Sequence, residues 1–194
     1  MTAAASMATH ASGRETIAGY PSGKSFSIDP TKYSSSTASE ITEARIYFST
    51  PDEYALYDNC IPGNLVLVGE IYSDTVVGEG ENASIKIELY DNKDSKLSTT
   101  TIPLETTRTE DLDNGETGYY GNVNVKISLP GNISYFKIVG NSHCVSLTII
   151  TFEIVTTTLS GCYATATGYK TKALGNNSFA EGQGTIAHGI NQHV

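Results

Sequence analysis

The chain has 194 residues, of which 39% are hydrophobic, enough for one core of ordinary size. Its net charge is −9, and residues 41–159 carry 17 acidic against 7 basic side chains, which repel phosphate backbones and exclude nucleic acid as an expected partner. No apolar stretch approaches the ~20 residues of a membrane span, and the first residues lack the basic leader and apolar segment of a secretory signal, so we expect neither membrane insertion nor a signal sequence.

Residues 1–40 are poor in large apolar side chains and rich in Ala, Ser, Thr and Gly, and they end in the run Ser34–Ser39. Alone, such a segment cannot bury enough surface to offset its ordering entropy. We therefore predict a linker or docking arm over 1–40, ordered only against a neighbouring subunit or a larger assembly. Ala11-Ser-Gly13 and Ala18-Gly19 resemble the repeat at the other end of the chain, out of register, so a second roll here is the alternative.

Residues 41–160 change to short strands in which apolar side chains recur at every second position. Ile85, Ile87 and Leu89 alternate with polar residues, and the same pattern runs from Val123 to Leu129. One face of each such strand is expected in a core and the other in water. Further strands are predicted over 44–48, 64–72, 97–103, 134–139 and 145–156. The sequence thus predicts an all-β domain, a β-sandwich of the jelly-roll or immunoglobulin-like kind.

Two features of this domain suggest binding. Residues 110–116 gather oxygen ligands in one turn, but their spacing does not fit an EF-hand, so we expect a solvated acidic hairpin loop. Tyr119 and Tyr120 follow this turn, in a chain with 12 tyrosines and no tryptophan. Tyrosines beside amide side chains combine flat apolar area with a hydrogen-bonding tip. Tyr119, Tyr120 and Asn122 are therefore the candidate receptor-binding or glycan-binding residues.

Motifs for catalysis or metal binding are not evident. Cys60, Cys144 and Cys162 are too scattered for a disulfide framework and form no Cys-x-x-Cys pair. His143 precedes Cys144, but neighbours on a strand point to opposite faces, and adjacency in sequence does not pair a nucleophile with a base. The chain has no zinc motif, phosphate-binding loop or dinucleotide fingerprint. We expect no catalytic residue, no metal and no cofactor, and a protein that is not an enzyme.

Residues 161–194 contain a repeat of small residues with a spacing of seven. Its members are the pairs Ala166 and Gly168, Ala173 and Gly175, Ala180 and Gly182, and Ala187 and Gly189. Such a period suits a solenoid in which each repeat is a short strand and a tight turn. Alanine fits where stacked rungs leave no room inside, and glycine supplies a positive φ or a close backbone approach. A coiled coil is excluded, because glycine at every seventh position costs about 1 kcal/mol each in a helix.

The stretch ATATGYKTKALGNNSFAEGQGTIAHG, Ala164 to Gly189, resembles the head repeats of trimeric autotransporter (YadA-like) adhesins. It resembles more closely the Ala-Glu-Gly repeats of phage tail fibres and spikes. The closing Asn191–Val194 looks like the end of the array that, in phage proteins, precedes a peptidase G2-like autoproteolytic domain. The resemblance covers about thirty residues and implies a left-handed parallel β-roll, trimeric, with about 14 residues per turn.

These observations lead to one functional hypothesis and two alternatives. The first is a structural component of a homotrimeric virion fibre or spike in the tail, whose sandwich is either a host-receptor head, binding a surface glycan or protein, or a spacer. The N-terminal arm would then attach to other virion proteins. The alternatives are a fragment of a trimeric autotransporter adhesin on a bacterial surface, and the non-catalytic part of an autoprocessed or carbohydrate-active enzyme.

Overall fold

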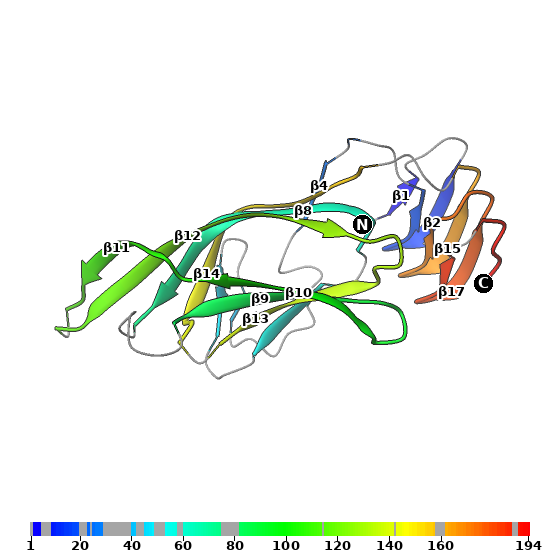
Figure 1. Ribbon diagram of the computed structural model, residues 1–194. Helices are drawn as coiled ribbons and strands as arrows, with labels where there is room; N and C mark the ends of the chain where they lie inside the picture. The colour runs from blue at the N-terminus through cyan, green and yellow to red at the C-terminus, as the bar shows by residue number, and fades with distance from the viewer. Residues whose placement is uncertain are drawn as a thin grey trace.

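In the computed structural model, strands dominate and the described part of the chain contains no helix (Figure 1). The structure describes residues 2–4, 9–19, 23, 25–28, 40–41, 45–48, 53–57, 60–74, 82–113, 115–141, 143–157, 162–187 and 190–194. Within these ranges, no helix is long and apolar enough to cross a membrane. The all-β prediction is confirmed.

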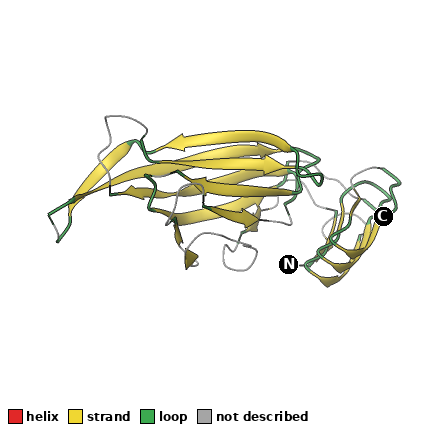
Figure 2. Ribbon diagram, turned by 90° about the horizontal axis from the view of Figure 1, so that it is seen from below, coloured by secondary structure: helices red, strands yellow, loops and turns green. Residues whose placement is uncertain are grey.

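Two antiparallel sheets pack face to face as a β-sandwich, which confirms that prediction (Figures 1 and 2). The smaller sheet has the order β10 (Lys96–Pro103), β9 (Ser84–Tyr90), β13 (Tyr135–Gly140) and β7 (Tyr54–Tyr57). The larger sheet has the order β11 (Thr106–Asp111), β12 (Thr117–Leu129), β8 (Gly63–Ser73), β14 (Ser146–Val155), β6 (Arg45–Tyr47) and β5 (Glu40–Ile41), with β4 (Ser25–Ser27) also paired to β14.

The sandwich core lies between the inward faces of the two sheets. Strand β8 buries every second residue over its whole length, and β9 buries Ile85, Ile87 and Leu89 as its alternation predicts. At the centre, the Tyr57 ring stacks on Phe136 with centroids 5.0 Å apart and meets Phe152 edge-on at 5.1 Å. Since Tyr57 and Phe136 come from the smaller sheet and Phe152 from the larger, this aromatic cluster joins the two layers.

Beside the sandwich, parallel strands form a second unit from both ends of the chain (Figure 2). One of its sheets has the order β1 (Ala3–Ala4), β3 (Ile17–Ala18), β16 (Lys172–Ala173) and β18 (Ile186–Ala187). The other has the order β17 (Phe179–Gln183), β15 (Thr165–Tyr169) and β2 (His10–Arg14). We call these two sheets the parallel unit.

The alanines and glycines of the sequence repeat lie in register in the parallel unit. Ala166 is paired with Ala180 on one side and with Ala11 on the other, and Gly168 with Gly182 and Gly13. A column of buried alanines fills the interior: Ala18, Ala164, Ala166, Ala173, Ala180 and Ala187. Positive φ angles occur at Gly168 and Gly182, whereas Gly175 is buried and its amide donates to the Ala187 carbonyl. Gly189 lies outside the described residues.

The N-terminal strands correct the prediction of a docking arm for part of 1–40. β2 pairs with β15 and β3 with β16, so Ala3–Ala4 and His10–Ala18 belong to the parallel unit. The alanines at 4, 11 and 18 in fact keep the spacing of seven, and only the glycine pattern differs. β2 and β3 overcome their ordering entropy by hydrogen-bonding to β15 and β16, which follow about 150 residues later in the chain. The sandwich is therefore inserted between two rungs of one stack.

Candidate functional site

The structure separates the three residues that the sequence proposes as a binding site. All lie on β12, but strand alternation turns them to different sides. Tyr119 is half-buried, faces inward and packs against the core, on the side of the sheet away from Tyr120. Tyr120 and Asn122 face outward from the larger sheet, half-buried and exposed respectively.

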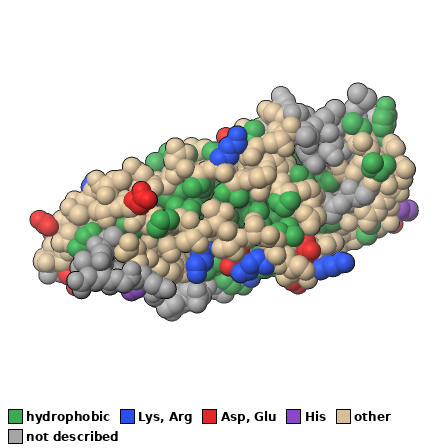
Figure 3. All heavy atoms as spheres, in the orientation of Figure 1, with side chains coloured by type: hydrophobic (Ala, Val, Ile, Leu, Met, Phe, Trp, Pro, Cys, Tyr) green, Lys and Arg blue, Asp and Glu red, His purple; other side chains and the backbone are tan. Residues whose placement is uncertain are grey.

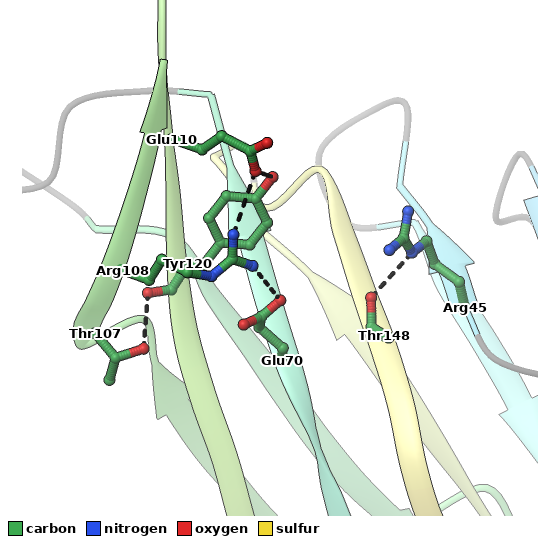
Figure 4. Close-up of polar contacts among 7 residues, drawn as sticks. All are labelled: Arg45, Glu70, Thr107, Arg108, Glu110, Tyr120 and Thr148. Carbon is green, nitrogen blue, oxygen red and sulfur yellow. Dashed lines mark hydrogen bonds and ion pairs between the residues drawn. The ribbon is translucent and has the colours of Figure 1, made fainter. Parts of the chain in front are cut away.

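Tyr120 lies between two partners from neighbouring strands. On β8, Tyr72 stands directly opposite, and the two ring centroids are 4.9 Å apart at an interplanar angle of 38°. On β11, the Arg108 guanidinium carbon lies 3.6 Å from the Tyr120 ring centroid (Figure 4). The Tyr120 ring thus contacts the Tyr72 ring on one neighbouring strand and the Arg108 guanidinium on the other.

Carboxylates fix this arginine. Arg108 Nη2 lies 3.0 Å from Glu70 Oε1, and Arg108 Nη1 lies 3.2 Å from Glu110 Oε2. The same Glu110 oxygen accepts a 2.9 Å hydrogen bond from the Tyr120 hydroxyl. Thr107 Oγ1 donates to the Tyr120 carbonyl at 3.2 Å (Figure 4). These contacts order long side chains before any ligand arrives, which lowers the entropy cost of binding.

Tyr72 and Tyr120, both half-buried, stay neutral well above physiological pH. Burial raises the pKa of Tyr120, and its hydrogen bond to Glu110 raises it further. Burial also raises the pKa of Tyr72, with the nearby carboxylates of Asp74, Glu116 and Glu110 acting in the same direction. Each therefore keeps a phenolic O–H donor at the edge of an apolar ring.

The outward face continues across β14 to β6. Thr148 lies level with Glu70, and Arg45 level with Thr148, in one row across the sheet. Arg45 Nε donates to Thr148 Oγ1 at 2.9 Å (Figure 4), and Arg45 Nη1 donates to the Tyr47 hydroxyl at 3.2 Å. We call this surface the tyrosine face; it comprises Tyr47, Tyr72 and Tyr120 with Arg45, Glu70, Arg108, Glu110, Asn122 and Thr148.

Charges on the outward faces of β6, β8, β11, β12 and β14 are balanced. Arg45, Arg108 and Lys126 are matched there by Glu70, Glu110 and Glu153. The tyrosine face therefore offers aromatic area, hydrogen-bond donors and acceptors, and no excess charge. Such a surface suits a ligand that is neutral, rich in hydroxyl groups and partly apolar.

Other candidates from the sequence take no part in this site. Cys144 is buried and its Sγ lies 3.9 Å from the Ser146 carbonyl oxygen, while His143 is half-buried. In the acidic turn, the Leu112 amide donates to the Glu116 carbonyl, closing a hairpin loop. The described residues include no group of three His, Cys, Asp or Glu placed to hold a metal ion. A separate hollow of about 260 Å³ lies beside β4 and the bulge of β14, where Ile150 is 73% exposed.

Sequence reasoning missed the partners of Tyr120. The alternation of β8 does place Glu70 and Tyr72 on its solvent side, which is the available signal. It does not show that β8 lies beside β12, or that β11 folds back to bring Arg108 over the ring. These contacts join residues far apart in the chain: Arg108 and Glu70 are 38 positions apart, and Tyr72 and Tyr120 are 48 positions apart (120 − 72).

No protein-family model matches the sequence, and a search of curated proteins finds no match. The solved structures that match this chain include three binding modules. A family 6 carbohydrate-binding module has 16% identity and a TM-score of 0.36, with 75% of this chain and 98% of that chain covered. A Streptococcus pneumoniae fucose binding module has 11% identity and a TM-score of 0.32, covering 66% and 95%.

The third is the C-terminal CBM6 of LamC from Zobellia galactanivorans, with 13% identity, a TM-score of 0.35, and 68% and 99% of the two chains covered. The ligands of these modules belong to those proteins and are not transferred to this chain. The ligand of this chain has to be inferred from its own surface residues.

Proposed function

We propose that the tyrosine face binds a neutral carbohydrate, and that the chain is a glycan-binding component of a homotrimeric fibre exposed on a virion. The Tyr72–Tyr120 pair, 4.9 Å apart on a solvent-facing sheet, carries this proposal. Sugar rings have apolar C–H faces that pack on aromatic rings and hydroxyls that need both donors and acceptors. Arg108, Glu70 and Asn122 supply those groups beside the rings.

The balance of acidic and basic side chains on the tyrosine face favours an uncharged ligand. An anionic glycan would meet Glu70 and Glu110, whose partner Arg108 is already engaged by both, and a cationic one would compete with Arg108 for them. A role limited to spacing is the competing function for the sandwich, and a bacterial surface is the competing location. In each case the role is binding or structural rather than catalytic.

The parallel unit supports the trimeric part of the proposal. Its interior is a column of alanines, so each rung buries little apolar surface on its own. Three of the four exposed large hydrophobic side chains among the described residues belong to this end of the chain: Tyr163, Ile190 and Val194. Tyr163 and Ile190 lie in turns at the same corner of the stack. These turns recur every 14 residues, since Cys162 is hydrogen-bonded to Asn176 and Asn177 to Asn191. We propose a left-handed parallel β-roll whose corners meet around a threefold axis.

Glycan binding is tested first by an array of neutral glycans and then by calorimetry on the best ligand. Tyr120→Ala and Tyr72→Ala are each expected to weaken binding at least tenfold, about 1.4 kcal/mol, because a central aromatic contact is lost. Tyr135→Ala, on the opposite face of the sandwich, is the matched control and should bind as the wild type does. Equal affinity in all four proteins would overturn the assignment of this face.

Oligomeric state is a separate test. Light scattering on the purified protein should give three times the 20.7 kDa of one chain. Replacing Ile190 by Asp should then release monomers, because a charge would be buried at the corner contact. A wild-type monomer would refute the fibre proposal and leave the glycan site to be judged on its own experiment.

A further inference from the structure

The smaller sheet carries a second, chemically different surface. Its outward residues include three tyrosines and three lysines, and one acid: Tyr54, Tyr90, Tyr135, Lys86, Lys96, Lys137 and Glu88. We call this surface the lysine face. Figure 3 shows Lys and Arg side chains along the lower side of the molecule, where Figure 1 places β9, β10 and β13. It lies on the side of the sandwich opposite the tyrosine face.

Aromatic contacts make this surface rigid. The Tyr90 and Tyr135 rings are stacked with centroids 4.9 Å apart and planes within 7° of parallel. Lys137 Nζ lies 4.4 Å from the Tyr54 ring centroid and 5.0 Å from that of Tyr90, so its ammonium group is held between two rings. The Tyr135 hydroxyl donates to Asp94 Oδ1 at 3.0 Å, which holds that ring in place. The cation and the rings are thus positioned in the absence of a ligand.

Positive charge on this face is only partly compensated. Lys96 Nζ lies 2.6 Å from Glu88 Oε1, and the Tyr90 hydroxyl donates to the other Glu88 oxygen at 2.7 Å. Three lysines against one glutamate leave a net charge of +2 on the described outward residues of β7, β9, β10 and β13, in a chain of net charge −9. The cationic face is therefore a local exception to an acidic protein.

Lys86 has no charged partner among the residues that the structure describes. Among the described residues, no hydrogen bond or ion pair reaches its ammonium group. It stands opposite Val139 on β13, diagonal to Lys137 and two residues from Glu88 on its own strand. The like charges of Lys86 and Lys137 repel each other across this diagonal, and an anion bound between them would relieve that repulsion.

We propose that the lysine face is a second binding site, which takes an acidic saccharide through anionic groups on its sugar rings. The anionic groups would pair with Lys86, Lys96 and Lys137, and the apolar faces of the rings would lie along Tyr54 and Tyr90. A saccharide fits better than a nucleic acid, because a patch of three lysines on an acidic chain neutralises few phosphates. The site is independent of the tyrosine face, which lies on the other sheet and carries no excess charge.

Calorimetric titration of the full chain at low salt, with tetragalacturonate as probe and galactotetraose as its neutral counterpart, tests this proposal. The acidic probe should bind and the neutral one should not bind at this face. Lys86→Gln and Lys137→Gln should each weaken binding roughly tenfold, as expected for loss of one charge-assisted contact. Lys126→Gln, on the outer side of the larger sheet, is the matched control and should leave binding unchanged.

Lys86→Gln keeps the test decisive if Lys137→Gln perturbs folding, because Lys86 has no polar contact to lose among the described residues. Raising the salt from about 50 to about 300 mM should weaken wild-type binding, and Lys86→Gln should show a smaller salt dependence. The proposal is overturned if tetragalacturonate does not bind, if Lys126→Gln weakens binding as much as Lys86→Gln, or if a single-stranded DNA oligomer binds more tightly than the saccharide. Tyr120→Ala should leave this binding intact, so failure here is distinct from failure of the neutral-glycan site.

Discussion

Replacing Gly168 by Ala should damage the parallel unit more than any surface substitution. Gly168 has φ +120°, and a Cβ there would overlap the Gly182 carbonyl oxygen and come within 2.9 Å of its carbonyl carbon. The residue opposing it is backbone in a paired strand, so neither side can move without breaking the register of β15 and β17. Backbone strain of about 1–3 kcal/mol and overpacking of about 1–3 kcal/mol add to roughly 4 kcal/mol.

Two glycine controls separate these costs. Gly184, in the same unit, has φ +69°, and a Cβ added there would meet nothing within 4 Å, so Gly184→Ala carries only the left-handed cost of about 1 kcal/mol. Gly131 has open space and no positive φ, so Gly131→Ala should stay within about 0.5 kcal/mol of the wild type.

Differential scanning calorimetry measures the result. For a chain of this size each kcal/mol lowers Tm by about 2–4 °C, so Gly168→Ala should lower it by roughly 8–16 °C, against about 2–4 °C for Gly184→Ala. Equal losses in the two variants would refute the reasoning, because they would show that the stacked strands tolerate a side chain between them.

Three further predictions concern single side chains. Burial raises the pKa of the Cys144 thiol to about 12. Iodoacetamide at pH ~8.5 should therefore label half-exposed Cys162 first, and Cys144 only after unfolding. Rapid labelling of Cys144 in the native protein, seen by mass spectrometry, would contradict this. Burial opposes ionisation of Glu88, but hydrogen bonds from Lys96 and Tyr90 outweigh it and lower its pKa. The stability that this shift contributes should be present above the unfolded pKa of about 4.3 and disappear as the pH falls through the folded value. Glu88→Gln should therefore lower the free energy of urea unfolding by about 1 kcal/mol at about pH 7 and leave it unchanged at about pH 2. An equal loss at both pH values would contradict this. Buried Lys172 donates to the Cys60 carbonyl at 2.9 Å and to the Ser134 carbonyl at 3.1 Å. Lys172→Met should therefore lower the free energy of unfolding by about 2 kcal/mol in urea titrations, and Lys170→Met, at a half-exposed position, is the control. Equal values for the two variants would show that these hydrogen bonds do not hold the parallel unit to the sandwich.

Local patterns in the sequence predict much of the sandwich. The alternation at Ile85–Leu89 and Val123–Leu129 locates β9 and β12, because a half-buried strand needs that period whatever its partner. Strand β11 has no such signal: all of its residues are exposed. It pairs through its backbone with β12 at the edge of the sheet, which its side chains do not reveal.

Long-range pairing explains what the sequence alone does not predict. Ala4, Ala11 and Ala18 have the right spacing, but the partners that join Ala11 and Ala18 to the rest of the stack follow a sandwich-length insertion, so no local window shows that stack. The contacts of the tyrosine face are also long-range. Strand alternation places Tyr120 outward, yet Arg108 and Tyr72 reach it only through the order of the strands in the sheet.

The insertion of the sandwich into a stack of rungs determines how the molecule would carry mechanical load. A force applied between the first and last strands passes through the bonds that join β2 to β15 and β3 to β16, and bypasses the residues between them. The sandwich is a side branch and experiences tension only after those two contacts separate. The two surfaces proposed to bind saccharides can therefore keep their shape while the stack that supports them is pulled.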